Sequence, residues 1–110
     1  MIVRYAIFEG RINRGREAEF RKFVEDRLVP LWTAFPGAEQ VRVQFESAHD
    51  DGAPDYPLVL AIQYPDMETC ERALQSDVRA KSRQVTEELV KMFTGRIHHH
   101  VFQGNAYDGR

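Results

Sequence analysis

Three consecutive histidines, His98, His99 and His100, are the most unusual group in this sequence for chemistry. They stand between Ile97 and Val101, inside a strand-like segment, so we interpret them as part of the fold. Alternation along a strand places His98 and His100 on one face and His99 on the other. Histidine carries protons near neutral pH. His98 and His100 are therefore the predicted catalytic residues, although the pattern does not tell which face of the sheet they occupy.

Two other interpretations of the histidines stay open. Histidines two residues apart on a strand are separated by ~6.5 to 7 Å, close enough to share a metal or to flank a substrate. A metal needs three or four ligands, and the remaining histidine, His49, lies in a predicted loop. We therefore predict no metal site. The last interpretation is structural, with the histidines hydrogen-bonded in the sheet or at a dimer seam.

Four further side chains are the predicted substrate-binding residues. Tyr5 can donate a hydrogen bond to a carbonyl, and Trp32 can line a cleft beside an aromatic ligand. Arg42 and Gln63 are polar residues on strands, where a covered position would require hydrogen-bond partners. Each also has a plain structural interpretation, as a core residue, a cross-dimer contact or a solvated edge residue. Arg4, which interrupts an apolar strand, has the same ambiguity.

Composition excludes several classes of function. Fifteen basic and seventeen acidic residues give a net charge of -2, so no basic footprint for nucleic acid or an anionic membrane is present. No apolar run approaches the ~18 to 20 residues that span a bilayer. The single cysteine, Cys70, excludes an internal disulfide framework and predicts a cytoplasmic protein with an inert, packed thiol. No phosphate-binding glycine loop or cysteine-histidine metal motif occurs, and we predict no cofactor.

The order of the segments predicts one α+β domain with β-α-β-β-α-β order. Densely apolar runs over 2–9 and 58–64 predict central strands, and strict alternation over 41–46 predicts a strand with one polar face. The last predicted strand covers 97–103. We expect the domain to span residues 1–103, followed by a polar tail over 104–110.

Two helical regions connect these strands. Apolar residues spaced by three and four predict a helix over 16–29, followed by a short restarted turn because Pro30 interrupts the pattern. In the second region, Asp66 is the predicted N-cap of a short helical segment, and Ser76 with Asp77 is the predicted cap of a long one. Gly95 is the predicted end of the long segment.

The first and third strands are apolar on both of their faces, and this predicts the assembly. Two helices can cover only one face of a four-stranded sheet. A bare apolar face exceeds what soluble monomers usually expose, and a second copy can bury it by a two-fold. We therefore predict a homodimer formed through the sheet face. On the first strand the two sets are Ile2, Ala6 and Phe8 on one face, and Val3, Tyr5 and Ile7 on the other.

Four short motifs resemble the dimeric α/β-barrel superfamily, which has a ferredoxin-like fold, and within it the EthD (ethyl tert-butyl ether degradation) type of domain. The element order matches over residues 1 to 103. The motifs are Phe20-x-x-Phe23, Val29-Pro30-Leu31, Phe35-Pro36-Gly37 and Ala73-Leu74-Gln75-Ser76-Asp77-Val78.

This resemblance implies two sheets packed face to face, helices outside, and a small-molecule pocket between each sheet and its helices. Relatives include cofactor-independent monooxygenases of polyketide quinones, lactone isomerases and haem-binding members. The implied function is an oxygenase or isomerase of aromatic, quinone or lactone-like compounds; the alternative is a ligand-binding or structural domain without turnover. A histidine that the family often carries is replaced by Leu28, and no histidine falls on either predicted helix to hold haem.

Overall fold

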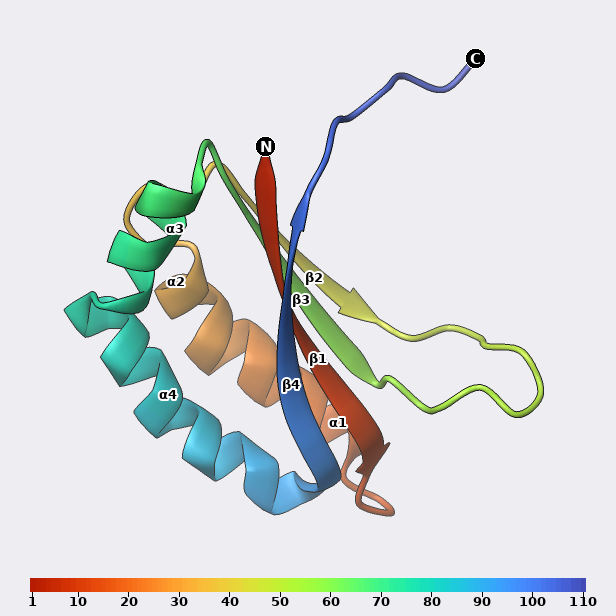
Figure 1. Ribbon diagram of the computed structural model, residues 1–110. Coiled ribbons are helices and arrows are strands. Elements are labelled where there is room, and N and C mark those ends of the chain that lie inside the picture. The colour runs from red at the N-terminus through yellow and green to blue at the C-terminus, as the bar shows by residue number, and fades with distance from the viewer.

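The computed structural model describes residues 1–110 as a four-stranded antiparallel sheet with all helices on one face (Figure 1). This is the predicted α+β, ferredoxin-like fold, and the strand order β2-β3-β1-β4 places the two densely apolar strands at its centre. The elements are β1 (Ile2–Ile12), α1 (Glu17–Phe23), a π-helical segment (Val24–Leu28), α2 (Val29–Trp32), β2 (Gln40–Phe45), β3 (Leu58–Tyr64), α3 (Met67–Leu74), α4 (Asp77–Leu89), a 3₁₀ turn (Val90–Met92) and β4 (Phe93–Gln103).

The outer strand β4 starts at Phe93 rather than Ile97, and this corrects the prediction for Gly95. That glycine does not end a helix; it lies inside β4, directly opposite Gly10 of β1. A Cβ atom at Gly95 would lie 2.1 Å from the carbonyl oxygen of Glu9, and the backbone φ is 154°. A Cβ atom at either glycine would clash with the backbone of the opposite strand, so both positions require glycine.

The first helical arm is continuous where the sequence predicted a break near Val29. The turn widens just before Pro30, and the amide of Val29 donates to the carbonyl oxygen of Val24, five residues back. Proline has no amide hydrogen, and its ring would clash with the carbonyl four residues earlier. A wider π turn moves that carbonyl away, so the arm passes Pro30 without ending.

Both predicted N-caps of the second helical region are confirmed. The Asp66 carboxylate accepts a hydrogen bond of 2.8 Å from the amide of Thr69 at the start of α3. The Ser76 hydroxyl accepts one of 3.3 Å from the amide of Arg79 at the start of α4. Such caps each contribute about 1 kcal/mol. They fix where α4 begins, and hence which of its side chains face the sheet.

The core fills the space between the helices and the inner face of the sheet. Burial of each large apolar side chain there contributes about 1.5 to 3 kcal/mol. None of the helices is both long and apolar enough to cross a membrane. The largest fully buried side chains are Tyr64, Phe8, Phe20, Leu28, Leu58, Leu89, Val24 and Cys70.

The outer face of the sheet has no covering element within the chain (Figure 1). The strand pairs align its side chains in rows that cross all four strands. One row runs Arg42, Ala61, Tyr5 and His100. Apolar side chains occupy the middle of this outer sheet face, and Phe102 at its edge is 57% exposed. The rest of the apolar set is Val3, Ile7 and Val59.

Candidate functional site

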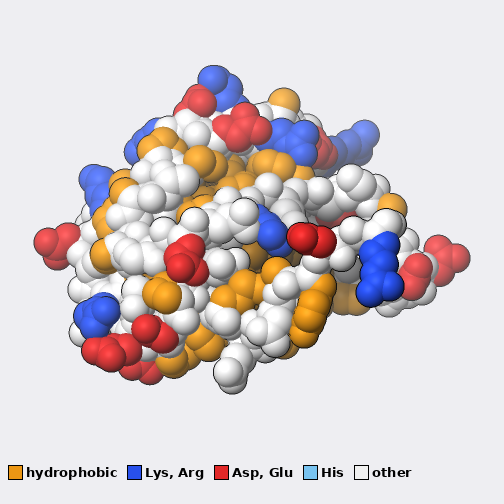
Figure 2. Space-filling model, turned by 90° about the horizontal axis from the view of Figure 1, so that it is seen from above, with side chains coloured by type: hydrophobic (Ala, Val, Ile, Leu, Met, Phe, Trp, Pro, Cys, Tyr) orange, Lys and Arg blue, Asp and Glu red, His pale blue; other side chains and the backbone are white.

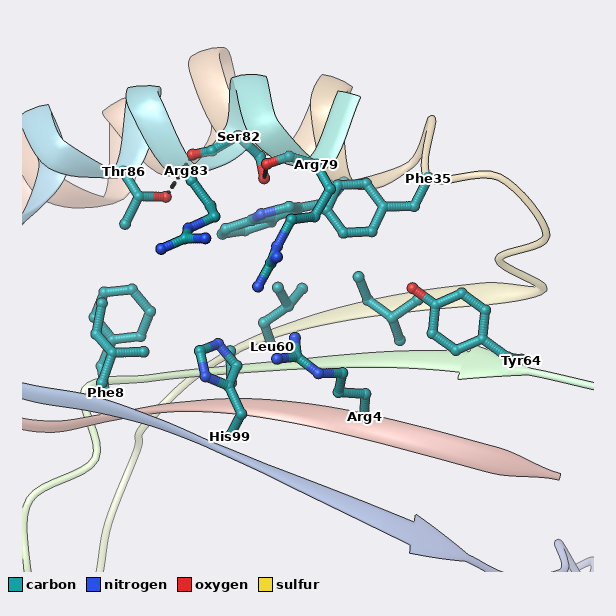
Figure 3. Close-up of a pocket in the computed structure, with 14 residues that line it drawn as sticks. Arg4, Phe8, Phe35, Leu60, Tyr64, Arg79, Ser82, Arg83, Thr86 and His99 are labelled. Atoms are coloured by element: carbon teal, nitrogen blue, oxygen red, sulfur yellow. Dashed lines mark hydrogen bonds between the residues drawn. The ribbon is translucent and has the colours of Figure 1, made fainter. Parts of the chain in front are cut away.

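A cavity of about 370 Å³ lies between α4 and the inner face of the sheet (Figure 3). Seen from the end of the molecule that carries the termini, hydrophobic side chains gather around a recess with a basic side chain among them (Figure 2). The cavity combines apolar walls with a few basic and hydroxyl side chains, as small-molecule sites do. Its lining consists of Arg4, Ala6, Phe8, Trp32, Phe35, Leu60, Ile62, Tyr64, Arg79, Ser82, Arg83, Thr86, Ile97 and His99.

Three arginines reach this cavity from two layers. Arg4 rises from β1, whereas Arg79 and Arg83 descend from α4 (Figure 3). Arg79 and Arg83 are four residues apart, so they lie on the same side of the helix. Burial, followed by repulsion from Arg79, lowers the pKa of Arg4. Burial and the neighbouring Arg83 lower the pKa of Arg79 in the same way.

His99 is the histidine of the cavity. It lies on β4 opposite Ala6 of β1, and its side chain points towards the arginines (Figure 3). Burial, and then the charges of Arg4 and Arg79, lower the pKa of His99 to about 4. The imidazole is therefore neutral at pH 7 and can accept a proton or a hydrogen bond.

Two hydroxyl groups of α4 complete the polar side of the cavity. The Ser82 hydroxyl donates to the carbonyl oxygen of Arg79 at 2.7 Å, and that of Thr86 donates to the carbonyl oxygen of Ser82 at 2.7 Å. Because their hydrogens are used by the helix backbone, both oxygens are left as acceptors. No aspartate or glutamate lines the cavity.

Of the six residues predicted for the site, only Trp32 lines this cavity, where it is 4% exposed. The other five lie together on the outer sheet face: His98, His100, Tyr5, Arg42 and Gln63. In the single chain the predicted catalytic histidines are therefore separated from Trp32 by the sheet itself.

His98 and His100 are linked by hydrogen bonds on that outer face. Nδ1 of His98 lies 2.8 Å from Nε2 of His100, and Nε2 of His98 lies 3.0 Å from a carboxylate oxygen of Glu9. Arg96 donates to the same carboxylate at 3.2 Å, and this bond, together with that from His98, lowers the pKa of Glu9. These hydrogen bonds fit the structural interpretation of the two histidines. They link the side chains in a row that ends at a partially exposed edge of the sheet.

The sequence contained a signal for the cavity residues that the prediction did not use. Arg4 has the same strand parity as the core residues Ala6 and Phe8, and His99 has that of Ile97. A basic side chain in an inward-facing position is costly unless it lines a site. To place Arg79 and Arg83 on the inward side of α4, the N-cap position of that helix had to be known first.

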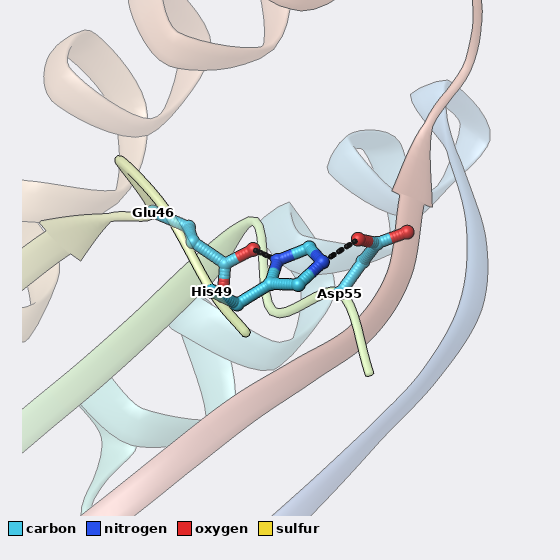
Figure 4. Close-up of side chains that lie close together, drawn as sticks. All are labelled: Glu46, His49 and Asp55. Carbon is cyan, nitrogen blue, oxygen red and sulfur yellow. Dashed lines mark hydrogen bonds and ion pairs between the residues drawn. The ribbon is translucent and has the colours of Figure 1, made fainter. Parts of the chain in front are cut away.

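A second group of titratable side chains closes the base of the loop between β2 and β3 (Figure 4). His49 lies between two carboxylates, with Nδ1 2.8 Å from Glu46 and Nε2 3.3 Å from Asp55. The hydrogen bond with Glu46 raises the pKa of His49. One potential ligand atom from each residue lies within 4.8 Å of the others. Here the imidazolium itself supplies the positive charge between the two carboxylates, so we interpret the group as a loop clamp.

No family model and no curated protein match the chain. Solved structures do. An EthD family protein from Bacillus halodurans has a TM-score of 0.73 and 16% identity, over 96% of this chain and 99% of that one. SnoaB, a cofactor-independent oxygenase from Streptomyces nogalater, has a TM-score of 0.65 and 17% identity, over 96% and 94%.

A third similar structure is a putative antibiotic biosynthesis monooxygenase from Deinococcus radiodurans. Its TM-score is 0.65 at 10% identity, with 100% of this chain and 98% of that one covered. At these identities the likeness establishes the fold, which is the ferredoxin-like fold predicted from the motifs.

Proposed function

We propose that the cavity between α4 and the sheet binds a small aromatic compound and that the chain transforms it without a bound cofactor. The observation that carries this proposal is the cavity itself, in which a neutral histidine and three arginines face an aromatic wall. The likeness to structures that include a cofactor-independent oxygenase supports the reaction class. An isomerase and an oxygenase are the two forms of this chemistry.

The proposed first step is removal of a proton from a carbon or hydroxyl next to an aromatic carbonyl. The electron pair of the broken bond becomes an enolate or phenolate, whose oxygen accepts hydrogen bonds from Arg4 or Arg79. The proton moves to the free ring nitrogen of His99. Burial, and then repulsion from the arginines, give His99 a pKa of about 4, which makes it a weak base in the empty site. The negative charge of the enolate offsets the repulsion.

The second step distinguishes the two reactions. In an isomerisation the proton returns from His99 to a different carbon, and no oxidant is consumed. In an oxygenation dioxygen is the oxidant: a methylene group becomes a carbonyl, one oxygen atom enters the product, and the other leaves as water. Trp32 and Phe35 would cover the planar substrate on its apolar side.

Turnover with anthrone-type and lactone-type compounds tests the proposal, with oxygen uptake and absorbance as readouts. His99→Gln should reduce kcat by about 10²-fold or more, the usual contribution of a general base. The matched control is the double variant His98→Gln with His100→Gln, which alters the same strand on its other face. It should keep turnover. Loss of turnover in the control alone would overturn this assignment and favour the catalytic histidines predicted from the sequence.

A binding protein without turnover is the second candidate function. The low pKa of His99 favours this candidate, because a weakly basic imidazole accepts a hydrogen bond from a ligand more readily than it takes up a proton. Saturable binding of the same compounds, with no product after prolonged incubation, would select this candidate.

We also infer a cytoplasmic homodimer, joined through the outer sheet face. Apolar side chains on this face support the interface, since soluble monomers seldom leave such a patch uncovered. They are Tyr5, Ile7, Val59 and the exposed Phe102. The free thiol of Cys70 supports the reducing compartment.

A further inference from the structure

The arginines of the cavity have no anionic partner within the chain. None of Arg4, Arg79 and Arg83 takes part in any salt bridge of the structure, all of which involve other residues. The guanidinium of Arg79 donates only to the backbone carbonyl of Leu74, at 3.2 Å. Three positive charges therefore converge on one half-enclosed space without compensation, and arginine cannot lose its charge at physiological pH.

This convergence is local and does not follow from the composition. The chain as a whole carries a net charge of -2, and acidic residues outnumber basic ones. Carboxylates are thus abundant, yet none lines the cavity. Two exposed arginines elsewhere, Arg16 and Arg72, each pair with a glutamate, at 2.9 Å and 2.7 Å. Other exposed arginines, such as Arg14, form no salt bridge either. What distinguishes the cavity is that three arginines line one space and no carboxylate lines it with them.

The shape of the guanidinium group narrows the class of ligand. A planar fork of N–H donors fits the two oxygens of a carboxylate, and arginines on opposite walls can hold one carboxylate between them. Arg4 lies on the sheet side and Arg79 on the helix side, with open space between their ends (Figure 3). Three aromatic side chains, Phe8, Trp32 and Phe35, also line the cavity, so it can hold a flat apolar body as well as a charged group.

We propose that the ligand of this cavity is an aromatic acid, whose carboxylate binds between Arg4 of β1 and the Arg79–Arg83 pair of α4 while its ring lies against Trp32. This inference rests on the proposed function, because it takes the cavity as the binding site and specifies the charged group of its ligand. His99 then lies beside the carboxylate, where its ring accepts a proton more readily than in the empty cavity.

Binding of 2-naphthoate and of its neutral isostere 2-naphthamide tests the charge requirement. Two-dimensional amide NMR titrations give both the affinity and the location of the ligand. We expect 2-naphthoate to bind at least about 10-fold more tightly than 2-naphthamide, with shifts centred on residues of the cavity. Inorganic phosphate should bind more weakly than 2-naphthoate, because it has no ring to place on the aromatic wall.

Substitutions of single arginines test where the ligand's carboxylate binds in the cavity. Arg79→Met and Arg4→Met should each remove most of the preference for 2-naphthoate, whereas Arg79→Lys should retain part of it. Arg14→Met is the matched control: Arg14 is exposed in the turn before α1, and its loss removes one charge without changing the cavity. Circular dichroism and thermal unfolding verify that each variant folds.

The outcomes separate this inference from the proposed function. Equal binding of naphthoate and naphthamide in the cavity would overturn the aromatic acid and leave the proposed function standing. Equal binding of phosphate and naphthoate would overturn the role of the ring. If neither aromatic compound shifts residues of the cavity, the proposed function fails together with the inference. Loss of the preference in Arg14→Met as well would mean that the preference reflects the charge of the whole chain, and this too would overturn the inference.

Discussion

At the scale of single residues, the environment of His99 is set by charges on three neighbouring elements. Arg4 comes from β1, Arg79 and Arg83 come from α4, and His98 is adjacent on β4. Partial burial opposes protonation of His99 most strongly, and all of these charges act in the same direction. The pKa of His99 is consequently about 4, below the usual value near 6.5.

This low pKa predicts a loss of stability in mild acid. Between about pH 6.5 and pH 4 the unfolded chain protonates His99 whereas the folded chain does not, so the free energy of unfolding falls as the pH is lowered. Replacement by glutamine, which does not titrate, removes this contribution. Urea unfolding between pH 7 and pH 4.5 should therefore show a smaller loss in His99→Gln than in the wild type. Parallel losses in the two proteins would contradict the assignment.

At the scale of elements, the loop between β2 and β3 depends on the protonation of His49. The ring bridges Glu46 and Asp55 with both of its nitrogens, which requires the imidazolium form. Because the pKa of His49 is raised, this clamp is fully present below about pH 6.5 and is lost as the pH rises through the pKa of the folded state.

Hydrogen exchange can follow the clamp directly. After correction for intrinsic rates, amides of residues 46–57 should be better protected at pH 6 than at pH 9. His49→Gln should abolish the difference, because the glutamine side chain does not titrate between pH 6 and pH 9. Ser47→Ala, an exposed substitution in the same loop, is the control and should leave it intact. Protection that is independent of pH in the wild type would argue against the clamp.

The contact of Gly10 with Gly95 makes a second prediction for the elements. Gly95→Ala places a Cβ atom against the carbonyl oxygen of Glu9 in a backbone conformation that alanine rarely adopts. We expect a loss of about 2 kcal/mol or more in chemical denaturation. Gly109→Ala, in the tail with no atom nearby, should be neutral. A cost below about 0.5 kcal/mol for Gly95→Ala would mean that the strands separate easily there.

The elements were largely predictable from the sequence, whereas the site was not. Local patterns determine Leu58–Tyr64 and the Asp66 cap, since a short apolar run and a helix cap each depend on a few neighbouring residues. The orientation of β4 is different. Both of its parities carry apolar side chains, Ile97 on one and Phe102 on the other, so the pattern groups His98 with His100 without telling which face meets the helices. That choice depends on pairing with β1 and on packing against α4, which are long-range.

At the scale of the whole molecule, the sheet has two faces with different roles. The inner face supports the core and the cavity, and the outer face gathers the remaining apolar side chains with the linked histidines. Strand alternation thus keeps the proposed ligand site apart from the proposed dimer interface. A substitution in the ligand site should therefore leave dimer formation largely unaffected, and a substitution in the dimer interface should leave ligand binding largely unaffected.

Sedimentation tests the interface. At micromolar concentration the wild type should sediment as a species of about twice the chain mass of 12.8 kDa. Ile7→Asp puts a charge in the middle of the outer sheet face and should shift the protein to monomer with its fold retained. Lys81→Asp, on the exposed side of α4, should remain dimeric. A monomeric wild type would rule out the interface.

The histidine triplet also has a consequence for how this domain tolerates insertions. A one-residue insertion early in β4 would advance every following side chain to the opposite side of the sheet, which normally replaces one set of groups by another. Here His98 would move into the place of His99, so the ligand site would still contain an imidazole. Repetition of one residue type therefore keeps an imidazole in the ligand site when β4 is shifted by one residue.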